Sequence, residues 1–170
     1  MRCQGYKVLA QATTGIAADL LERGRTVHSR FKVPLFVDKE TELDVKASSI
    51  LGKQLIDSDL IIIDEVSAMK KDILEAINKL LKMLMNSSTI FGGKVMVLSG
   101  DFRQTLPVIE GVNSEILIAE SSLLTCDLFT KNFERRKLSI NMRARAEDED
   151  FKKWLLCVGS GIEESREFGE

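Results

Sequence analysis

Two adjacent acids, Asp64 and Glu65, follow directly on a short apolar run, Leu60-Ile61-Ile62-Ile63. Three successive isoleucines after a leucine are typical of a strand that is buried on both faces of a sheet. Open α/β sheets bind their ligands at the carboxyl ends of such strands. There an aspartate can hold a magnesium ion through carboxylate oxygens, and a neighbouring glutamate can orient or polarise an attacking water. This pair of acids therefore favours nucleotide hydrolysis.

A second apolar run ends in another acid about forty residues later. Residues 94–99 lead into Gly100-Asp101, and Arg103 and Gln104 follow. We expect a second buried strand here, with a cation and an amide well placed for phosphate; a polar surface loop is the alternative interpretation. Gln104 could sense a terminal phosphate. Arg143 could neutralise charge that develops during transfer, an effect worth ~10³–10⁵ in rate for measured arginine fingers.

The elements around these residues predict an α/β fold, a parallel sheet flanked by helices. Between the two runs, a helix is predicted from a capping box of Asp72 and Glu75. Its apolar residues share one face, which we interpret as core packing: Ile73, Ile77, Leu80, Leu81 and Leu84. Strand, helix and strand of these lengths form a βαβ unit, which implies parallel strands and a right-handed crossover.

Two further helices are expected before the acid pair. A first strand at residues 6–10 is followed by a turn, and Thr13 or Thr14 then caps a helix that runs to Gly24. Its predicted apolar face carries Ile16, Leu20 and Leu21. Ser48 or Ser49 is expected to cap a short helix that extends to about residue 56.

Composition narrows the class of protein. The chain has 170 residues and a formal net charge of −2, which suits one globular domain and gives no overall basic field for nucleic acid. Cys3, Cys126 and Cys157 lie far apart and outside metal-ligand spacing, so we expect reduced thiols. Because no secretory signal and no membrane-length apolar stretch are present, we expect an intracellular protein without a membrane partner.

Five segments, in order and at sensible spacing, resemble successive motifs of the PIF-type helicases, superfamily-one five-prime to three-prime DNA helicases. They are Thr13-Thr14-Gly15-Ile16-Ala17-Ala18, Thr26-Val27-His28-Ser29, Ile62-Ile63-Asp64-Glu65, Gly100-Asp101-Phe102-Arg103-Gln104 and Asn141-Met142-Arg143. Residues 91–94 and 104–109 look most like the versions in Helitron-type transposons. The resemblance spans residues 8 to about 160.

The resemblance implies an ATP-dependent DNA helicase with a RecA-like P-loop NTPase helicase domain. Residues 1–145 would be a partial RecA-like motor domain, and residues 146–170 a C-terminal helix and the start of a second motor domain. The implied cofactors are ATP and Mg²⁺, and the implied partner is single-stranded DNA, with a monomer as the default state. Work in DNA repair, recombination or telomere maintenance would place the chain in the nucleus, with the mitochondrion as the alternative.

The same resemblance assigns a role to each matched position. Asp64 would hold magnesium, and Glu65 would activate the water. Gln104 would couple the terminal phosphate to strand movement, and Arg143 would contact that phosphate from the far side. The segments that would touch single-stranded DNA contain Thr14, Gly15 and His28.

One family motif has no counterpart in these 170 residues. The family begins with a glycine-rich phosphate loop that ends in Gly-Lys-Ser or Gly-Lys-Thr, and the only Gly-Lys before the central strand is Gly52-Lys53-Gln54. It lacks the first glycine and the hydroxyl, so we reject it. We therefore expect a domain truncated at its N-terminus, with an exposed sheet edge, and at most trace ATPase activity.

Two other classes of function remain open at this point. A magnesium-dependent phosphohydrolase or nuclease could use Asp64 and Asp101 as ligands without a phosphate loop. A non-catalytic remnant of a transposon helicase could bind single strands regardless of nucleotide. DNA cleavage without ATP would favour the first, and strand binding unchanged by Glu65→Gln would favour the second.

Overall fold

The computed structural model describes residues 4–102, 122–138, 140, 151, 153–155 and 157. The chain divides into two compact units, Met1–Asn132 and Phe133–Glu170. The second unit includes helical residues between 151 and 157, where the rings of Phe151 and Trp154 stack with centroids 5.8 Å apart. The predicted boundary at residue 145 lies outside the described residues. In the described part of the chain, no helix combines the length and apolar character needed to span a membrane.

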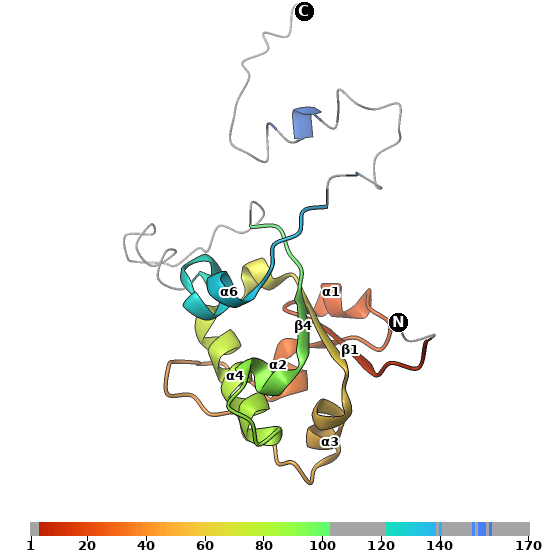
Figure 1. Cartoon of the computed structure of the whole chain (residues 1–170). Helices are drawn as coiled ribbons and strands as arrows, with labels where there is room; N and C mark the ends of the chain where they lie inside the picture. Colours follow the sequence, from red (N-terminus) through yellow and green to blue (C-terminus); the bar gives the residue numbers. More distant parts are fainter. Residues whose placement is uncertain are drawn as a thin grey trace, which may run out of the picture. The chain divides into compact units, whose positions relative to one another are not determined.

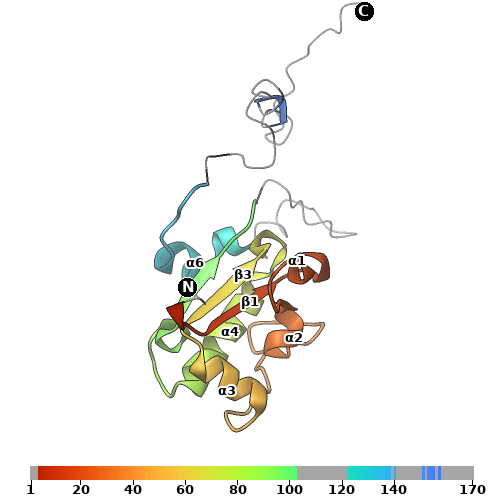
Figure 2. The ribbon, with the colours of Figure 1, turned by 90° about the vertical axis from the view of Figure 1, so that its right-hand side faces the viewer.

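The first unit contains a four-stranded parallel sheet in the order β2-β1-β3-β4 (Figures 1 and 2). The strands are β1 (Val8–Ala12), β2 (Arg25–Thr26), β3 (Leu60–Asp64) and β4 (Val95–Leu98). Ala12 lies opposite both Thr26 and Asp64, and Ile63 lies opposite Leu98. The predicted parallel sheet, and the strand that ends in the first acid, are confirmed.

Helices connect these strands and cover one face of the sheet. Figure 2 shows α2 and α4 behind the sheet, with β1 and β3 toward the viewer. The α-helices are α1 (Gly15–Asp19), α2 (Val27–Phe31), α3 (Ile50–Asp57), α4 (Lys71–Leu84) and α6 (Asp127–Asn132). Shorter 3₁₀ turns are η2 (Val66–Ala68), η3 (Ile90–Gly93) and η4 (Leu123–Thr125).

The packing of α4 confirms the predicted apolar face, since all five residues named for it are buried. Ile61 and Ile63 of β3, both fully buried, belong to the same core. The predicted capping box is wrong. The helix begins at Lys71, with Lys70 at the N-cap and no side-chain cap, so Asp72 falls inside the first turn. The spacing of the apolar residues predicted the helix correctly, whereas the pattern of Asp72 and Glu75 predicted the wrong first residue.

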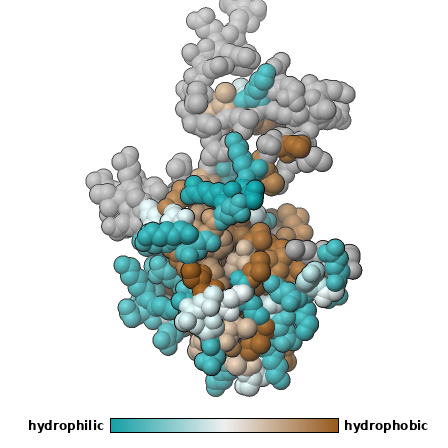
Figure 3. Space-filling view, viewed as in Figure 1, coloured by the Kyte–Doolittle hydropathy of each residue, from teal (hydrophilic) through white to brown (hydrophobic). Residues whose placement is uncertain are grey.

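The prediction that β4 is buried on both faces is wrong. Its residues Val95 and Val97 are 60% and 44% exposed. They alternate with Met96 and Leu98 along an outer strand of the described sheet, so they share a face that α4 does not cover. Side-chain exposure on a face does not test the expected exposed edge, which stays a prediction. Apolar side chains gather on the surface of this region (Figure 3).

The helix after β1 is shorter than expected and does not bury the predicted face. α1 ends at Asp19, Ile16 and Leu20 are 82% and 84% exposed, and Ala18 is its buried residue. The chain then folds back so tightly that only glycine fits at position 24, since a Cβ at Gly24 would lie 2.1 Å from the carbonyl oxygen of Ala18. The remaining helix prediction holds, since Ser49 caps α3 by accepting from the amide of Gly52.

Candidate active site at the carboxyl edge of the sheet

All four strands end at one edge because they are parallel, and each delivers polar residues there. β1 leads into Thr13 and Thr14, and β2 ends at Thr26. β3 delivers the acid pair, and β4 delivers Ser99. The strand order therefore places the threonine segments on one half of the edge and the acids on the other half.

The carboxylate of Asp64 is held through one of its oxygens. Oδ1 accepts from the backbone amide of Glu65 at 3.0 Å and from the hydroxyl of Ser99. Backbone bonds fix Ser99 in turn: its amide donates to Ile63 and its carbonyl accepts from Val66, both at 2.9 Å. Within the described residues, Oδ2 accepts no hydrogen bond. Among the described residues, one carboxylate oxygen is thus anchored and the other has no hydrogen-bond partner.

Glu65 has a left-handed backbone, with φ 56° and ψ 37°. This conformation costs a residue with a Cβ roughly 1–2 kcal/mol. The neighbouring contacts maintain it, because its amide donates to Asp64 Oδ1 and its carbonyl accepts from Ala68 at 3.1 Å. The chain therefore turns sharply directly after β3 and keeps the half-buried Glu65 beside Asp64 at the edge. Strain at an acid pair is an observation that favours a functional site.

The donor set at this edge fits magnesium in one particular way. Among the described residues, no group of three or more His, Cys, Asp or Glu side chains could hold a metal by itself. Mg²⁺ in nucleotide sites is commonly held by one or two carboxylates together with waters and substrate phosphates. A half-exposed Asp64 whose Oδ2 accepts no bond from the described residues meets that requirement, whereas these residues form no metal site from protein ligands alone.

The residues expected to touch single-stranded DNA lie on the other half of this edge. Thr14 caps α1 by accepting from the amide of Ala17 at 3.3 Å. Gly15 is exposed, and a Cβ added to it would meet nothing within 4 Å. His28 lies in the first turn of α2, which Thr26 caps. Ala12 and Thr26 are paired in register, so both segments start from adjacent strand ends.

Two predicted site residues, Gln104 and Arg143, lie outside the described residues, so their placement stays a prediction. Asp101 is described, three positions past the end of β4, and is half-buried. Sequence reasoning missed Ser99, whose hydroxyl contacts Asp64. A hydroxyl residue directly after a predicted strand was the available signal.

The rejected segment Gly52-Lys53-Gln54 lies in α3, which follows α2 instead of the strand that precedes a phosphate loop. The amide of Gly52 is already bonded to the side chain of Ser49. Gly52 is required for packing instead, since a Cβ there would lie 2.2 Å from the carbonyl oxygen of Lys46.

Comparisons of the sequence with family models and with known proteins point to the same family. A family model described as PIF1-like helicase matches residues 1–168. The ATP-dependent DNA helicase PIF1 of Emericella nidulans is 32% identical over 111 residues, which cover 64% of this chain and 15% of that protein. The ATP-dependent DNA helicase Pif1 of a Psychrobacter species is 33% identical over 111 residues, covering 64% and 16%. The matched segment thus spans about a sixth of the length of these relatives.

The matches to solved structures extend over nearly the whole chain. The Bacteroides Pif1 structure bound to single-stranded DNA has a TM-score of 0.78 and 26% identity, covering 95% of this chain and 38% of that one. A Bacteroides Pif1 complex with ADP-AlF3 and single-stranded DNA has a TM-score of 0.76 and 25% identity, covering 92% and 37%.

Proposed function

The chain belongs to the PIF1-like helicase family, and we propose that it forms part of an ATP-dependent DNA helicase. Its parallel sheet and helices have the fold of the RecA-like domain of Pif1 helicases, as the resemblance implied. The observation that carries the proposal is the shared carboxyl edge. There the acid pair on β3 adjoins the strand ends that carry the threonine segments.

In this proposal Asp64 holds Mg²⁺ through Oδ2, the carboxylate oxygen that is free of hydrogen bonds in the described structure. A bound magnesium ion would neutralise phosphate charge and orient the terminal phosphate. Glu65 positions and polarises the attacking water from the strained turn beside it. Gln104 and Arg143 take the roles that the family resemblance assigns, contacting the terminal phosphate from the neighbouring strand end and from the far side.

Single-stranded DNA is the proposed polymer substrate, bound over the ends of β1 and β2. The open surface at Gly15 supports this, because a phosphate backbone can approach where no side chain intervenes. The caps at Thr14 and Thr26 leave their side-chain oxygens beside exposed backbone. Roles in repair, recombination or telomere maintenance, and a nuclear location, rest on family resemblance alone.

We also propose that these 170 residues alone have at most trace ATPase activity. A phosphate loop supplies amide donors and a lysine for the β- and γ-phosphates. Lys53 is in the only Gly-Lys before β3, but no hydroxyl residue follows it and α3 comes after α2 instead of a strand, so it does not fit that role. The acid pair would then act on a nucleotide that other residues must anchor.

A titration of the chain with labelled ATP and magnesium tests this proposal. We expect affinity weaker than about 1 mM, which corresponds to less than ~4 kcal/mol of binding free energy. Sub-millimolar affinity would refute it. In a fusion that supplies a strand, phosphate loop and helix from a PIF1-like relative, magnesium-dependent hydrolysis should appear and be lost on Glu65→Gln. Metal-dependent DNA cleavage without ATP would instead favour a nuclease.

A further inference from the structure

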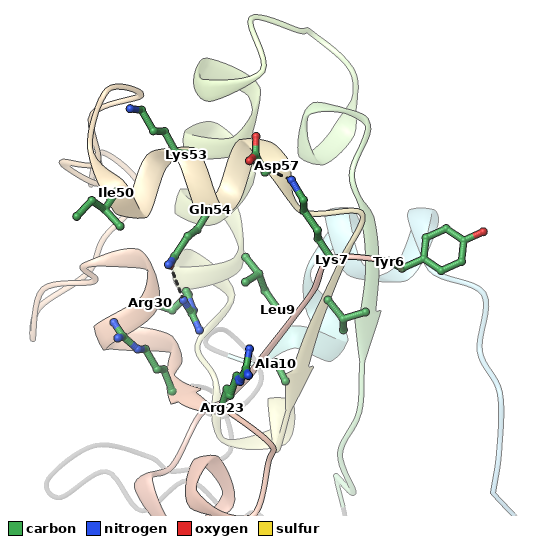
Figure 4. A pocket seen from close by; sticks show the side chains of 12 residues that line it. Tyr6, Lys7, Leu9, Ala10, Arg23, Arg30, Ile50, Lys53, Gln54 and Asp57 are labelled. Carbon is green, nitrogen blue, oxygen red and sulfur yellow. Dashed lines mark hydrogen bonds and ion pairs between the residues drawn. The ribbon is translucent and has the colours of Figure 1, made fainter. Parts of the chain in front are cut away.

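A second polar site lies away from the acid edge, beside the amino-terminal half of β1. A cavity of about 740 Å³ opens there, lined by residues of β1, β2, α2 and α3 (Figure 4). Its cationic lining comprises Lys7, Arg23, Arg25, Arg30 and Lys53, with Gln54 and Leu9 beside them. Leu9 lies three positions before Ala12, the register partner of Asp64, which is about 10 Å along the strand. This cavity is therefore distinct from the acid pair.

Arg30 is the central group of the cavity and is 5% exposed. Its Nη1 donates to the side-chain oxygen of Gln54 at 3.1 Å, as the dashed line in Figure 4 shows. Its Nε is buried and makes no hydrogen bond to any described residue. Burial first, and repulsion from Arg25 second, lower the pKa of this guanidinium. A buried guanidinium with an unsatisfied donor is costly unless an anion completes it.

The cavity contains no carboxylate that is free to do so. Its only acidic lining residue is Asp57, which accepts from Lys7 at 3.2 Å (Figure 4). Lys7 is therefore paired with Asp57, whereas the other four lining cations form no ion pair within the described part of the chain. Gln54 holds Arg30 in place through a neutral oxygen, so it orients the guanidinium without cancelling its charge.

We propose that this cavity is an anion site that binds a phosphate group, with Arg30 as its buried anchor. Guanidinium groups suit phosphate because their planar N–H donors match its oxygens in pairs and because they are more weakly hydrated than ammonium groups. Arg25 and Lys53 are exposed and supply charge at the rim of the cavity. The phosphate can belong to a free anion or to the backbone of a nucleic acid. The site does not depend on the helicase proposal, since it uses neither the acid pair nor Thr14, Gly15 or His28, although Arg25 directly precedes Thr26 in β2.

The test is a titration of the 170-residue chain followed by NMR of the Arg30 Nε–Hε group, in about 0.15 M salt to screen diffuse attraction. The probes are inorganic phosphate and a short oligothymidylate, each added separately. We expect the Arg30 signal to shift and saturate with at least one probe. A response to oligothymidylate only identifies a nucleic-acid backbone, and a response to inorganic phosphate identifies a free anion. If neither probe moves the signal, the proposal is overturned.

A second arm uses surface variants, because replacing the buried Arg30 could unfold the chain. The double variant Arg25→Gln/Lys53→Gln changes exposed residues only and should weaken binding by at least about fivefold. The matched control is Lys39→Gln, an exposed lysine on the loop before α3, and it should bind as the unmodified chain does. Equal affinity of the double variant and the control would overturn the proposal.

Discussion

The hydroxyl of Ser99, directly after β4, donates a hydrogen bond to Oδ1 of Asp64, the last residue of β3. This bond joins two strand ends at the acid pair, alongside the backbone bond between Val66 and Ser99. The proposed metal ligand is therefore oriented by the neighbouring strand, which ties the geometry of the site to the pairing of β3 with β4.

A double-mutant cycle measures that link. Ser99→Ala and Asp64→Ala each remove one partner, and hydrogen bonds to charged groups contribute about 1.5–3 kcal/mol, less when exposed. We expect a coupling of about 0.5–1.5 kcal/mol in the free energy of unfolding, measured by urea denaturation of the four chains. Strictly additive effects would show that the bond is not formed in solution.

Two adjacent glycines in η3 provide a matched pair. Both have positive φ, 62° at Gly92 and 79° at Gly93, but a Cβ at Gly92 would lie 2.5 Å from the carbonyl oxygen of Leu81, while one at Gly93 would meet nothing within 4 Å. Gly93→Ala should cost only the backbone strain, about 1–2 kcal/mol. Gly92→Ala should cost at least ~1 kcal/mol more in the free energy of unfolding, because η3 must move away from α4. Equal costs would contradict the close packing of η3 on α4.

Lys94 links β4 to the end of α3 and gives the stability a pH dependence. Its ammonium donates to the carbonyl oxygens of Ile56 and, at 2.8 Å, Ser58. Burial lowers its pKa from the usual 10.5, and Asp59 and Asp57 partly oppose that shift. Between the lowered pKa and 10.5 the unfolded chain binds more protons, so stability should rise with pH in that window. The difference in unfolding free energy between the unmodified chain and Lys94→Met should grow from pH 8 to about 10.5. A constant or shrinking difference would contradict the direction of the shift.

Gly15 allows the proposed DNA contact to be tested without disturbing the fold. Its φ is not positive and a Cβ would meet nothing within 4 Å, so Gly15→Ala should leave the Tm nearly unchanged. If a phosphate backbone lies against this residue, the added methyl group should weaken oligothymidylate binding roughly fivefold, equivalent to one lost hydrogen bond of ~1 kcal/mol. Fluorescence anisotropy measures the affinity. Unchanged binding would place the DNA elsewhere.

The parts of the fold that were predictable have local causes. The run from Leu60 to Ile63 is entirely apolar and therefore favours a buried strand. The position of the two acids at the end of that strand follows from residue order. The apolar face of α4 likewise follows from the spacing of its residues along the sequence. Ser49 caps α3 through its own side chain, which is also a local cause. The motifs around the acid pair indicated the helicase family, and the comparison with family models confirmed it.

The features that were not predictable depend on distant parts of the chain. Nothing in the local pattern shows that Ile16 and Val95 face outward, because their exposure depends on which elements pack against α1 and β4. The left-handed turn at Glu65 lies between Asp64 and Val66, which are both bonded to Ser99 at the end of β4. The burial of Arg30 depends on α3, more than twenty residues later in the sequence.

The most direct test of the central claim is whether the carboxyl edge of β3 binds a divalent metal through Asp64. Substoichiometric Mn²⁺, added to the chain in place of Mg²⁺, should broaden the NMR amide signals of Thr13, Glu65 and Ser99, which surround Asp64. Asp64→Asn should abolish this broadening, whereas Asp44→Asn, at an exposed position on the loop before α3, should leave it intact. Broadening that persists in Asp64→Asn, or that is absent from these three residues, would contradict the account.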